Sequence, residues 1–126
     1  MWTYSQSTGV LTDPDGNKVA TGYAGGNCGE NPDGVNNPAM QDQKGIGPLP
    51  QGIYSFGDPL SQSKLGPFAI PLIPSPDNEM YGRGGFFCHG DNLDMDHSAS
   101  EGCVIMPRTV RVQMWSSDDH TLQVTA

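Results

Sequence analysis

Glycine and proline are so frequent in this chain that they limit the secondary structure it can form. The 126 residues include 17 glycines and 11 prolines, and these show no collagen-like period. Proline breaks the interior of a helix and glycine weakens it, so no long helix is expected in the first hundred residues. The sequence therefore predicts a mostly β fold with short strands and long ordered loops.

The length indicates one domain, residues 1–126, built around a single hydrophobic core. No repeat, low-complexity tract or linker divides the chain. Apolar or alternating segments bounded by Gly, Pro, Asn and Asp predict the strands. They cover residues 2–6, 19–23, 53–56, 68–73, 86–89, 104–106 and 122–125.

Two segments carry further local signals. Pro71 interrupts the apolar run 68–73, and proline lacks the N–H that a ladder needs, so this strand is expected at an edge of the sheet. In residues 108–115, Val110 and Met114 share a helix face, and Pro107 suits the first turn of a helix. We therefore expect a short helix over 108–115.

The formal net charge is −8 at pH 7. Nucleic acid and anionic membranes repel an acidic surface, which argues against both as partners. No segment approaches the apolar length of a membrane span, and residues 1–5 do not read as a cleaved signal peptide. We expect a protein that is made in the cytoplasm and, if it acts elsewhere, is carried there by another route.

The chain has three cysteines, an odd number. In an oxidising compartment one thiol is then left without a disulfide partner, and such a thiol is a candidate reactive group. Cys28 and Cys88 could pair and spare Cys103, which we state as a hypothesis.

Cys103 and His89 are the candidate catalytic pair. Cys103 follows Gly102 at the start of an apolar run, and His89 ends the segment 86–89. A thiol needs a base or a positive neighbour to become a reactive thiolate, and histidine commonly supplies it near neutral pH. If 86–89 and 104–106 are adjacent strands, the two side chains can meet and form a site for acyl transfer.

The alternatives to a catalytic pair are that Cys103 is a buried structural cysteine and that His89 is a core histidine. Cys88 alternates away from His89 and is expected to face the core or a disulfide.

Other polar residues carry weaker signals. Arg83 and Arg108 are candidate anchors for a substrate carboxylate, since arginine can bind one with two hydrogen bonds, and Tyr81 and Tyr54 are candidates to line the cleft. Ordinary surface or core positions explain all four equally well. The acidic loop with Asp91, Asp94, Asp96 and His97 lacks the spacing of an EF-hand. No metal or cofactor is predicted.

The motifs resemble a known family. His89-Gly90 followed by Ser100-Glu101-Gly102-Cys103-Val104 is similar to the signature of the L,D-transpeptidase (YkuD-like) catalytic domain, and the turn at 47–54 is similar to that family's turn into a strand. The segments 2–9 and 22–25 resemble the branch that type VI secretion delivers as antibacterial effectors. The chain has Glu101 where the family pattern has histidine, and Ile105 where it often has arginine.

The resemblance implies a twisted β-sandwich or open barrel with one or two short helices. It implies that Cys103 attacks the bond between meso-diaminopimelate and D-alanine in peptidoglycan stem peptides, with His89 as base. The carbonyl of Gly90 orients the imidazole, the amides of Gly102 and Cys103 hold the oxyanion, and Ser100 and Glu101 support the signature. Further implied partners are an immunity protein and a secretion-machine component, and the implied place of action is the periplasm of a target bacterium.

Two other functions stay open at this point. One is a peptidoglycan amidase of the NlpC/P60 type that uses Cys28 as nucleophile and His89 as base, although no helical pattern follows Cys28. The other is a non-catalytic β module that binds cell-wall peptide.

Overall fold

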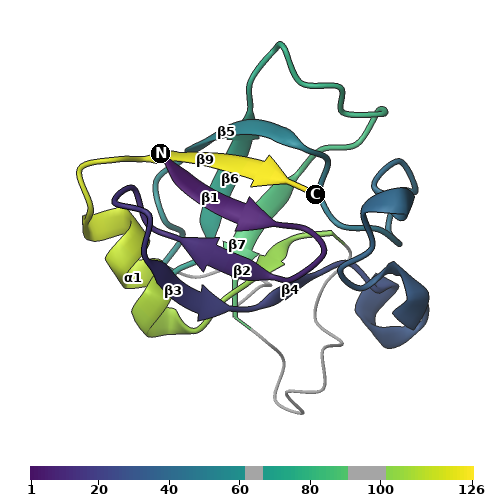
Figure 1. Ribbon diagram of the computed structural model, residues 1–126, viewed down its shortest axis with the longest axis horizontal. Coiled ribbons are helices and arrows are strands. Elements are labelled where there is room, and N and C mark those ends of the chain that lie inside the picture. Colours follow the sequence, from purple (N-terminus) through teal and green to yellow (C-terminus); the bar gives the residue numbers. More distant parts are fainter. Residues whose placement is uncertain (62–66, 91–101) are drawn as a thin grey trace.

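The computed structural model describes residues 1–61, 67–90 and 102–126, apart from the side chain of Cys28. In these ranges a nine-stranded sheet curls into a nearly closed barrel, with one α-helix beside it (Figure 1). The mostly β prediction is confirmed.

The strands are β1 (Trp2–Ser5), β2 (Val10–Thr12), β3 (Lys18–Thr21), β4 (Tyr23–Ala24), β5 (Gly52–Phe56), β6 (Ile70–Pro74), β7 (Phe86–His89), β8 (Val104–Ile105) and β9 (Thr121–Thr125). The helices are α1 (Arg108–Ser116) and three 3-10 helices, η1 (Asn27–Gly29), η2 (Pro32–Gly34) and η3 (Pro38–Met40).

The sheet closes through a bend at Gly22. Its strand order is β3-β2-β1-β9-β5-β6-β7-β8-β4, so its two end strands, β3 and β4, follow each other in the chain. A Cβ atom at Gly22 would lie 1.8 Å from the carbonyl oxygen of Ile105, so only glycine allows this approach. The single strand predicted over 19–23 is therefore split into two strands that pair with β2 and with β8.

The prediction that Pro71 marks an edge strand is wrong, because β6 pairs with both β5 and β7. The backbone N and C=O of one residue point to the same side of a strand. The carbonyl of Pro71 accepts the N–H of Gly57 at 2.8 Å, so its missing donor also faces the end of β5. That position lies just past Phe56, the last residue of β5, where the ladder needs no further donor.

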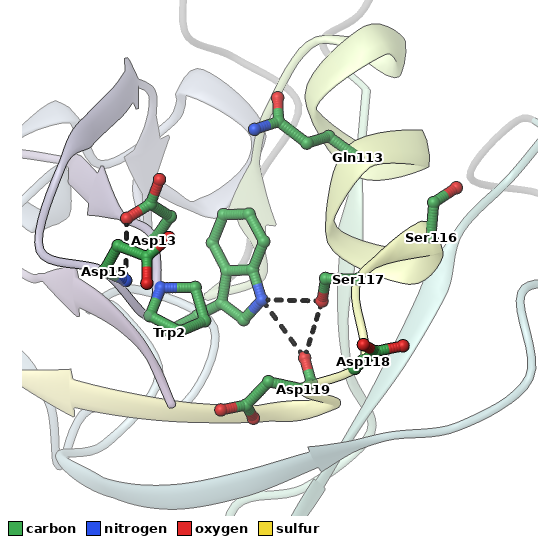
Figure 2. Close-up of a pocket in the computed structure, with 9 residues that line it drawn as sticks. Trp2, Asp13, Asp15, Gln113, Ser116, Ser117, Asp118 and Asp119 are labelled. Carbon is green, nitrogen blue, oxygen red and sulfur yellow. Dashed lines mark hydrogen bonds between the residues drawn. The ribbon is translucent and has the colours of Figure 1, made fainter.

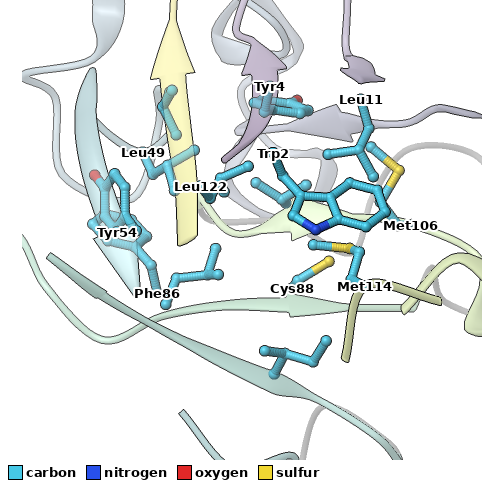
Figure 3. Packing of buried hydrophobic residues seen from close by; sticks show 14 of the residues in the cluster. Trp2, Tyr4, Leu11, Leu49, Tyr54, Phe86, Cys88, Met106, Met114 and Leu122 are labelled. Atoms are coloured by element: carbon cyan, nitrogen blue, oxygen red, sulfur yellow. The ribbon is translucent and has the colours of Figure 1, made fainter. Parts of the chain in front are cut away.

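The core fills the space enclosed by the sheet (Figure 3). Aromatic and aliphatic side chains alternate inward along the strands, as in Trp2 and Tyr4 on β1 and Leu122 and Val124 on β9. All four are at most 2% exposed. The hydroxyl of Tyr4 has no hydrogen-bond partner among the described groups, and burial raises the pKa of this phenol.

The predicted helix is present as α1, directly after Pro107. Val110 and Met114 form its buried face, as their spacing predicted. Arg111 is also buried, and its Nη1 donates to the carbonyls of Pro67 and Phe68, both at 3.0 Å. Within the described ranges, no helix has the length and apolar character that crossing a membrane requires.

Candidate functional site

The two segments that carry the candidate pair are neighbouring parallel strands. Cys88 of β7 pairs with Val104 of β8, and His89 pairs with Ile105. The predicted adjacency of these segments is confirmed. Cys103 directly precedes β8, two residues before the partner of His89. In a regular parallel ladder, with strands about 4.8 Å apart and a rise of about 3.3 Å per residue, two positions related in this way have Cα atoms roughly 8 Å apart.

The imidazole of His89 is oriented by the backbone. His89 is 3% exposed, and its Nδ1 lies 2.9 Å from the carbonyl oxygen of Gly90. A carbonyl oxygen can only accept, so Nδ1 carries the proton in this bond. In the neutral ring, Nε2 is then the basic nitrogen. The contact between Gly90 and the imidazole that the family resemblance implied is present.

The sulfur of Cys103 lies against the backbone of β7. Its Sγ accepts the N–H of Phe87 at 3.3 Å. An N–H donor favours the negatively charged form of its acceptor. Cys103 is half-buried, at the border of the core cluster.

Gly102 is required by the geometry next to Cys103. Its φ is +142°, a conformation that residues with side chains rarely adopt. A Cβ atom here would lie 2.7 Å from Nη2 of Arg83 and 2.8 Å from Cε1 of Phe86. The glycine before the cysteine thus allows a buried guanidinium and an aromatic ring to pack directly under the backbone of residue 102.

Cys88 has different surroundings, although its strand also carries His89. It is fully buried in the core, and burial raises its pKa from 9.0 to about 12. Its thiol is free, so the pairing of Cys88 with Cys28 is not present in this structure. The prediction that Cys88 faces the core is confirmed.

Cys103 lines a cleft of about 180 Å³. The other lining residues come from a loop before β5 and from the segment that enters β7; they are Lys44, Gly45, Arg83, Gly84, Gly85 and Phe86. Sequence analysis missed Lys44 and Gly45. They lie in a polar loop far from both motifs, and no short-range pattern marks them as neighbours of Cys103.

Arg83 lies in the wall of this cleft and is 7% exposed. Its guanidinium donates to three carbonyl oxygens: from Nη1 to Gln41 and to Pro48 (2.8 Å), and from Nη2 to Gly47 (2.9 Å). Its carbon Cζ also lies 5.2 Å from the centre of the Phe86 ring.

Burial lowers the pKa of Arg83, while electrostatic interactions with Tyr54, Cys103 and Asp42 raise it. Arg83 is thus a fixed positive charge beside the cleft.

The other candidate contact residues lie away from the lining of this cleft. Tyr81 is 44% exposed in a turn, and Arg108 is exposed at the start of α1. Tyr54 is buried and donates its hydroxyl to the carbonyl of Pro50 at 2.7 Å. Their proposed contacts with substrate stay predictions.

Several predicted residues lie outside the described ranges. They are Ser100, Glu101 and the acidic loop with Asp91, Asp94, Asp96 and His97. The side chain of Cys28 is likewise not described; its backbone belongs to η1, a three-residue 3-10 helix. Among the described residues, no group of three or more His, Cys, Asp or Glu side chains could hold a metal ion.

A larger cavity of about 520 Å³ lies between the β2–β3 turn and the end of α1 (Figure 2). Figure 2 shows the indole nitrogen of Trp2 bonded to Ser117 Oγ and to the carbonyl of Asp119, both at 3.1 Å. The described lining includes Asp13, Asp15 and Asp118 but no cysteine or histidine. The smaller cleft, not the larger cavity, contains the candidate cysteine.

A family model described as the Tlde1 domain matches residues 21–125. No curated protein and no solved structure matches the chain.

Proposed function

The chain belongs to the Tlde1 domain family, a family of type VI secretion effectors, and from this premise we propose that it is a cysteine acyltransferase acting on peptidoglycan stem peptides. The bond attacked joins the L-centre of meso-diaminopimelate to the D-alanine that follows it in a tetrapeptide stem. Transfer of the acyl group to water is L,D-carboxypeptidase activity. Transfer to a D-amino acid exchanges the terminal residue.

The observation that carries this proposal is the position of Cys103. It lines a cleft, its sulfur accepts a backbone N–H from Phe87, and His89 lies on the adjacent parallel strand. A nucleophile needs a base whose orientation is fixed by a third group. The carbonyl of Gly90 supplies that third group by holding Nδ1 of His89.

The first half-reaction forms a thioester. Nε2 of His89 takes the proton from the thiol of Cys103, and the sulfur attacks the carbonyl carbon of the diaminopimelate residue. The backbone amides of Gly102 and Cys103 stabilise the negative oxygen, and one such donor is typically worth about 3 to 4 kcal/mol. The C–N bond then breaks, and D-alanine leaves as an amine that takes the proton from His89.

The second half-reaction releases the enzyme. Water attacks the thioester carbon and gives its proton to His89, which returns it to the sulfur as the C–S bond breaks. The products are a tripeptide stem and the free thiol. When the amine of a D-amino acid attacks in place of water, a new amide bond forms. Peptidoglycan lies outside the cytoplasm, so this activity belongs in the periplasm of a target bacterium.

Muropeptides with tetrapeptide stems test the proposal directly. The wild-type protein is incubated with them, with and without added D-methionine, and the products are identified by mass spectrometry. We expect loss of one alanine, or its replacement by methionine. Both products should disappear with Cys103→Ala and persist with Cys28→Ser.

The same set of variants separates the rival functions. Activity that is lost with Cys28→Ser but kept with Cys103→Ala would support the amidase that uses Cys28. Stems that stay unchanged with folded wild-type protein, but bind to it, would support the non-catalytic module. Either result would overturn the acyltransferase.

A further inference from the structure

The charge of the described lining of the Cys103 cleft is opposite to that of the whole chain. The sequence has 14 Asp and Glu residues against six Lys and Arg. Two of those six, Lys44 and Arg83, are among the seven residues that line the cleft, and its described lining contains no carboxylate. Asp42, two residues before Lys44, is exposed and is not part of the lining. The charge of Asp42 still acts on Arg83, but the described lining itself carries only positive charge beside the candidate nucleophile.

The two positive charges play different parts. Arg83 is buried and donates to three backbone carbonyls, so its hydrogen-bonding groups are largely occupied by the protein itself. Lys44 is exposed, and among the described residues it forms no salt bridge. Lys44 is thus the cation that can reach a ligand, and Arg83 adds a fixed positive charge behind it.

The backbone that carries Lys44 is held in place on both sides. The amides of Ile46 and Gly47 both donate to the carbonyl of Gln43, which closes a turn around Lys44. Arg83 binds the carbonyl of Gln41 before this turn and the carbonyls of Gly47 and Pro48 after it. The stem of the Lys44 side chain therefore starts from a fixed point at the edge of the cleft.

The size of the cleft limits what can enter it. Its volume of about 180 Å³ is below the roughly 300–1,000 Å³ of pockets that enclose drug-sized ligands. A disaccharide or a folded peptide segment is too large. A single small residue with a negative charge fits both the volume and the charge.

We propose that this cleft binds the free terminal carboxylate of the substrate and that Lys44 is the residue that recognises it. The identification of that carboxylate as the one on the terminal D-alanine rests on the proposed function. In this arrangement Lys44 selects stems that end in a free acid and discriminates against stems whose last residue is amidated or joined to another chain.

Binding to a variant that cannot turn over separates this inference from catalysis. The probes are a tetrapeptide stem that ends in meso-diaminopimelyl-D-alanine and the same peptide with a C-terminal amide. Their dissociation constants are measured by calorimetry on the Cys103→Ala protein, alone and combined with Lys44→Gln. Lys18→Gln is the matched control, because Lys18 is an exposed lysine on β3, outside the cleft.

The Cys103→Ala protein should bind the acid more tightly than the amide. Lys44→Gln should weaken binding of the acid about fivefold, as expected for a partly exposed ion pair, and leave the amide unchanged. Lys18→Gln should change neither. The preference for the acid should also shrink as salt rises from about 0.01 M to 1 M, because salt screens exposed charges.

Equal binding of acid and amide, a preference that survives Lys44→Gln, or no binding of either peptide would each overturn the inference. None of these results depends on turnover by the wild-type protein, which tests the proposed function separately. Turnover that depends on Cys103 but treats acid and amide alike would leave the proposed function standing and remove the role of Lys44.

Discussion

Cys88 lies in β7 and Cys103 lies directly before the neighbouring strand β8, yet their surroundings differ in nearly every physical respect. Cys88 is in mid-strand, fully buried among apolar side chains, with its pKa raised to about 12. Cys103 lies just before β8 begins, is half-buried, and lines a cleft with two cations. Cys88 is completely shielded from solvent, whereas Cys103 is shielded only in part.

The difference arises from position relative to the strand end. Residues within β7 and β8 alternate between the core and the opposite face, and Cys88 and Val104 both belong to the core cluster. Gly102, with its positive φ, ends this regular geometry immediately before Cys103. The surroundings of Cys103, the position proposed to react, therefore depend on the glycine and on the buried Arg83 packed against it.

The most direct test of the difference between the two cysteines is to remove each thiol in turn. Cys103→Ala should reduce turnover of tetrapeptide stems by roughly 10⁴-fold or more, because the nucleophile is lost. Cys88→Ala should leave turnover nearly unchanged and destabilise the fold by on the order of 1 kcal/mol, because it leaves a small cavity. Turnover is measured by mass spectrometry and stability by urea unfolding. Equal losses of turnover would show that Cys88 belongs to the reaction.

Alkylation by iodoacetamide compares the two thiols without a substrate. At pH 8 the folded protein should be labelled at Cys103, while Cys88 reacts roughly 10³ times more slowly than an exposed thiol, because a pKa near 12 in place of 9.0 leaves far less thiolate. Peptide mapping gives both rates. His89→Gln should slow labelling of Cys103 and flatten its pH dependence without affecting Cys88.

Rapid labelling of Cys88 in folded protein would contradict the buried assignment. If His89→Gln leaves the labelling rate of Cys103 unchanged, the imidazole is not the base of this thiol. The positive charges that line the cleft would then be the remaining source of its activation.

A third test concerns the glycine that separates the two environments. Gly102→Ala should destabilise the fold by roughly 2 to 3 kcal/mol, because it combines a strained φ with contacts of 2.7 and 2.8 Å to Arg83 and Phe86. Gly84→Ala is the control: Gly84 also lines the cleft, but a Cβ atom there meets nothing within 4 Å. Urea unfolding of both variants measures the difference. A cost for Gly84→Ala as large as that for Gly102→Ala would rule out the steric explanation.

The part of this site that sequence could predict is the part set by local signals. Glycines and aromatic residues mark the strand 86–89, and a histidine at its end and a Gly-Cys pair at the next strand suggest a base and a nucleophile. The structure keeps these segments as β7 and β8. The helix after Pro107 was likewise predictable, because its buried face is spaced at three to four residues.

The remainder depends on how distant segments pack. Arg83 binds the loop that carries Lys44 at the edge of the cleft, and nothing near Lys44 in the sequence indicates that contact. The expectation for Pro71 was wrong for a related reason: whether a missing N–H matters depends on where the neighbouring strand β5 ends, which is a tertiary property.

The dependence of stability on pH distinguishes the buried thiol of Cys88 from that of Cys103. The pKa of Cys88 is higher in the folded protein than its ordinary value of 9.0, so the folded state keeps a proton that the unfolded chain loses above pH 9. Unfolding then releases a proton, and stability falls as pH rises from about 9 toward 12, by at most about 1.4 kcal/mol per pH unit from this group. Burial also raises the pKa of Tyr4 and Tyr54, whose ordinary value is 10.0, so they add to the fall mainly above pH 10.

Between pH 9 and 10 the loss should therefore come largely from Cys88, and Cys88→Ala should make the free energy of unfolding less steep in that interval. Urea unfolding at pH 8, 9 and 10 measures both slopes. If the two proteins lose stability equally over this range, Cys88 is not held as a buried neutral thiol, and its contrast with Cys103 would have to lie in steric access rather than in charge.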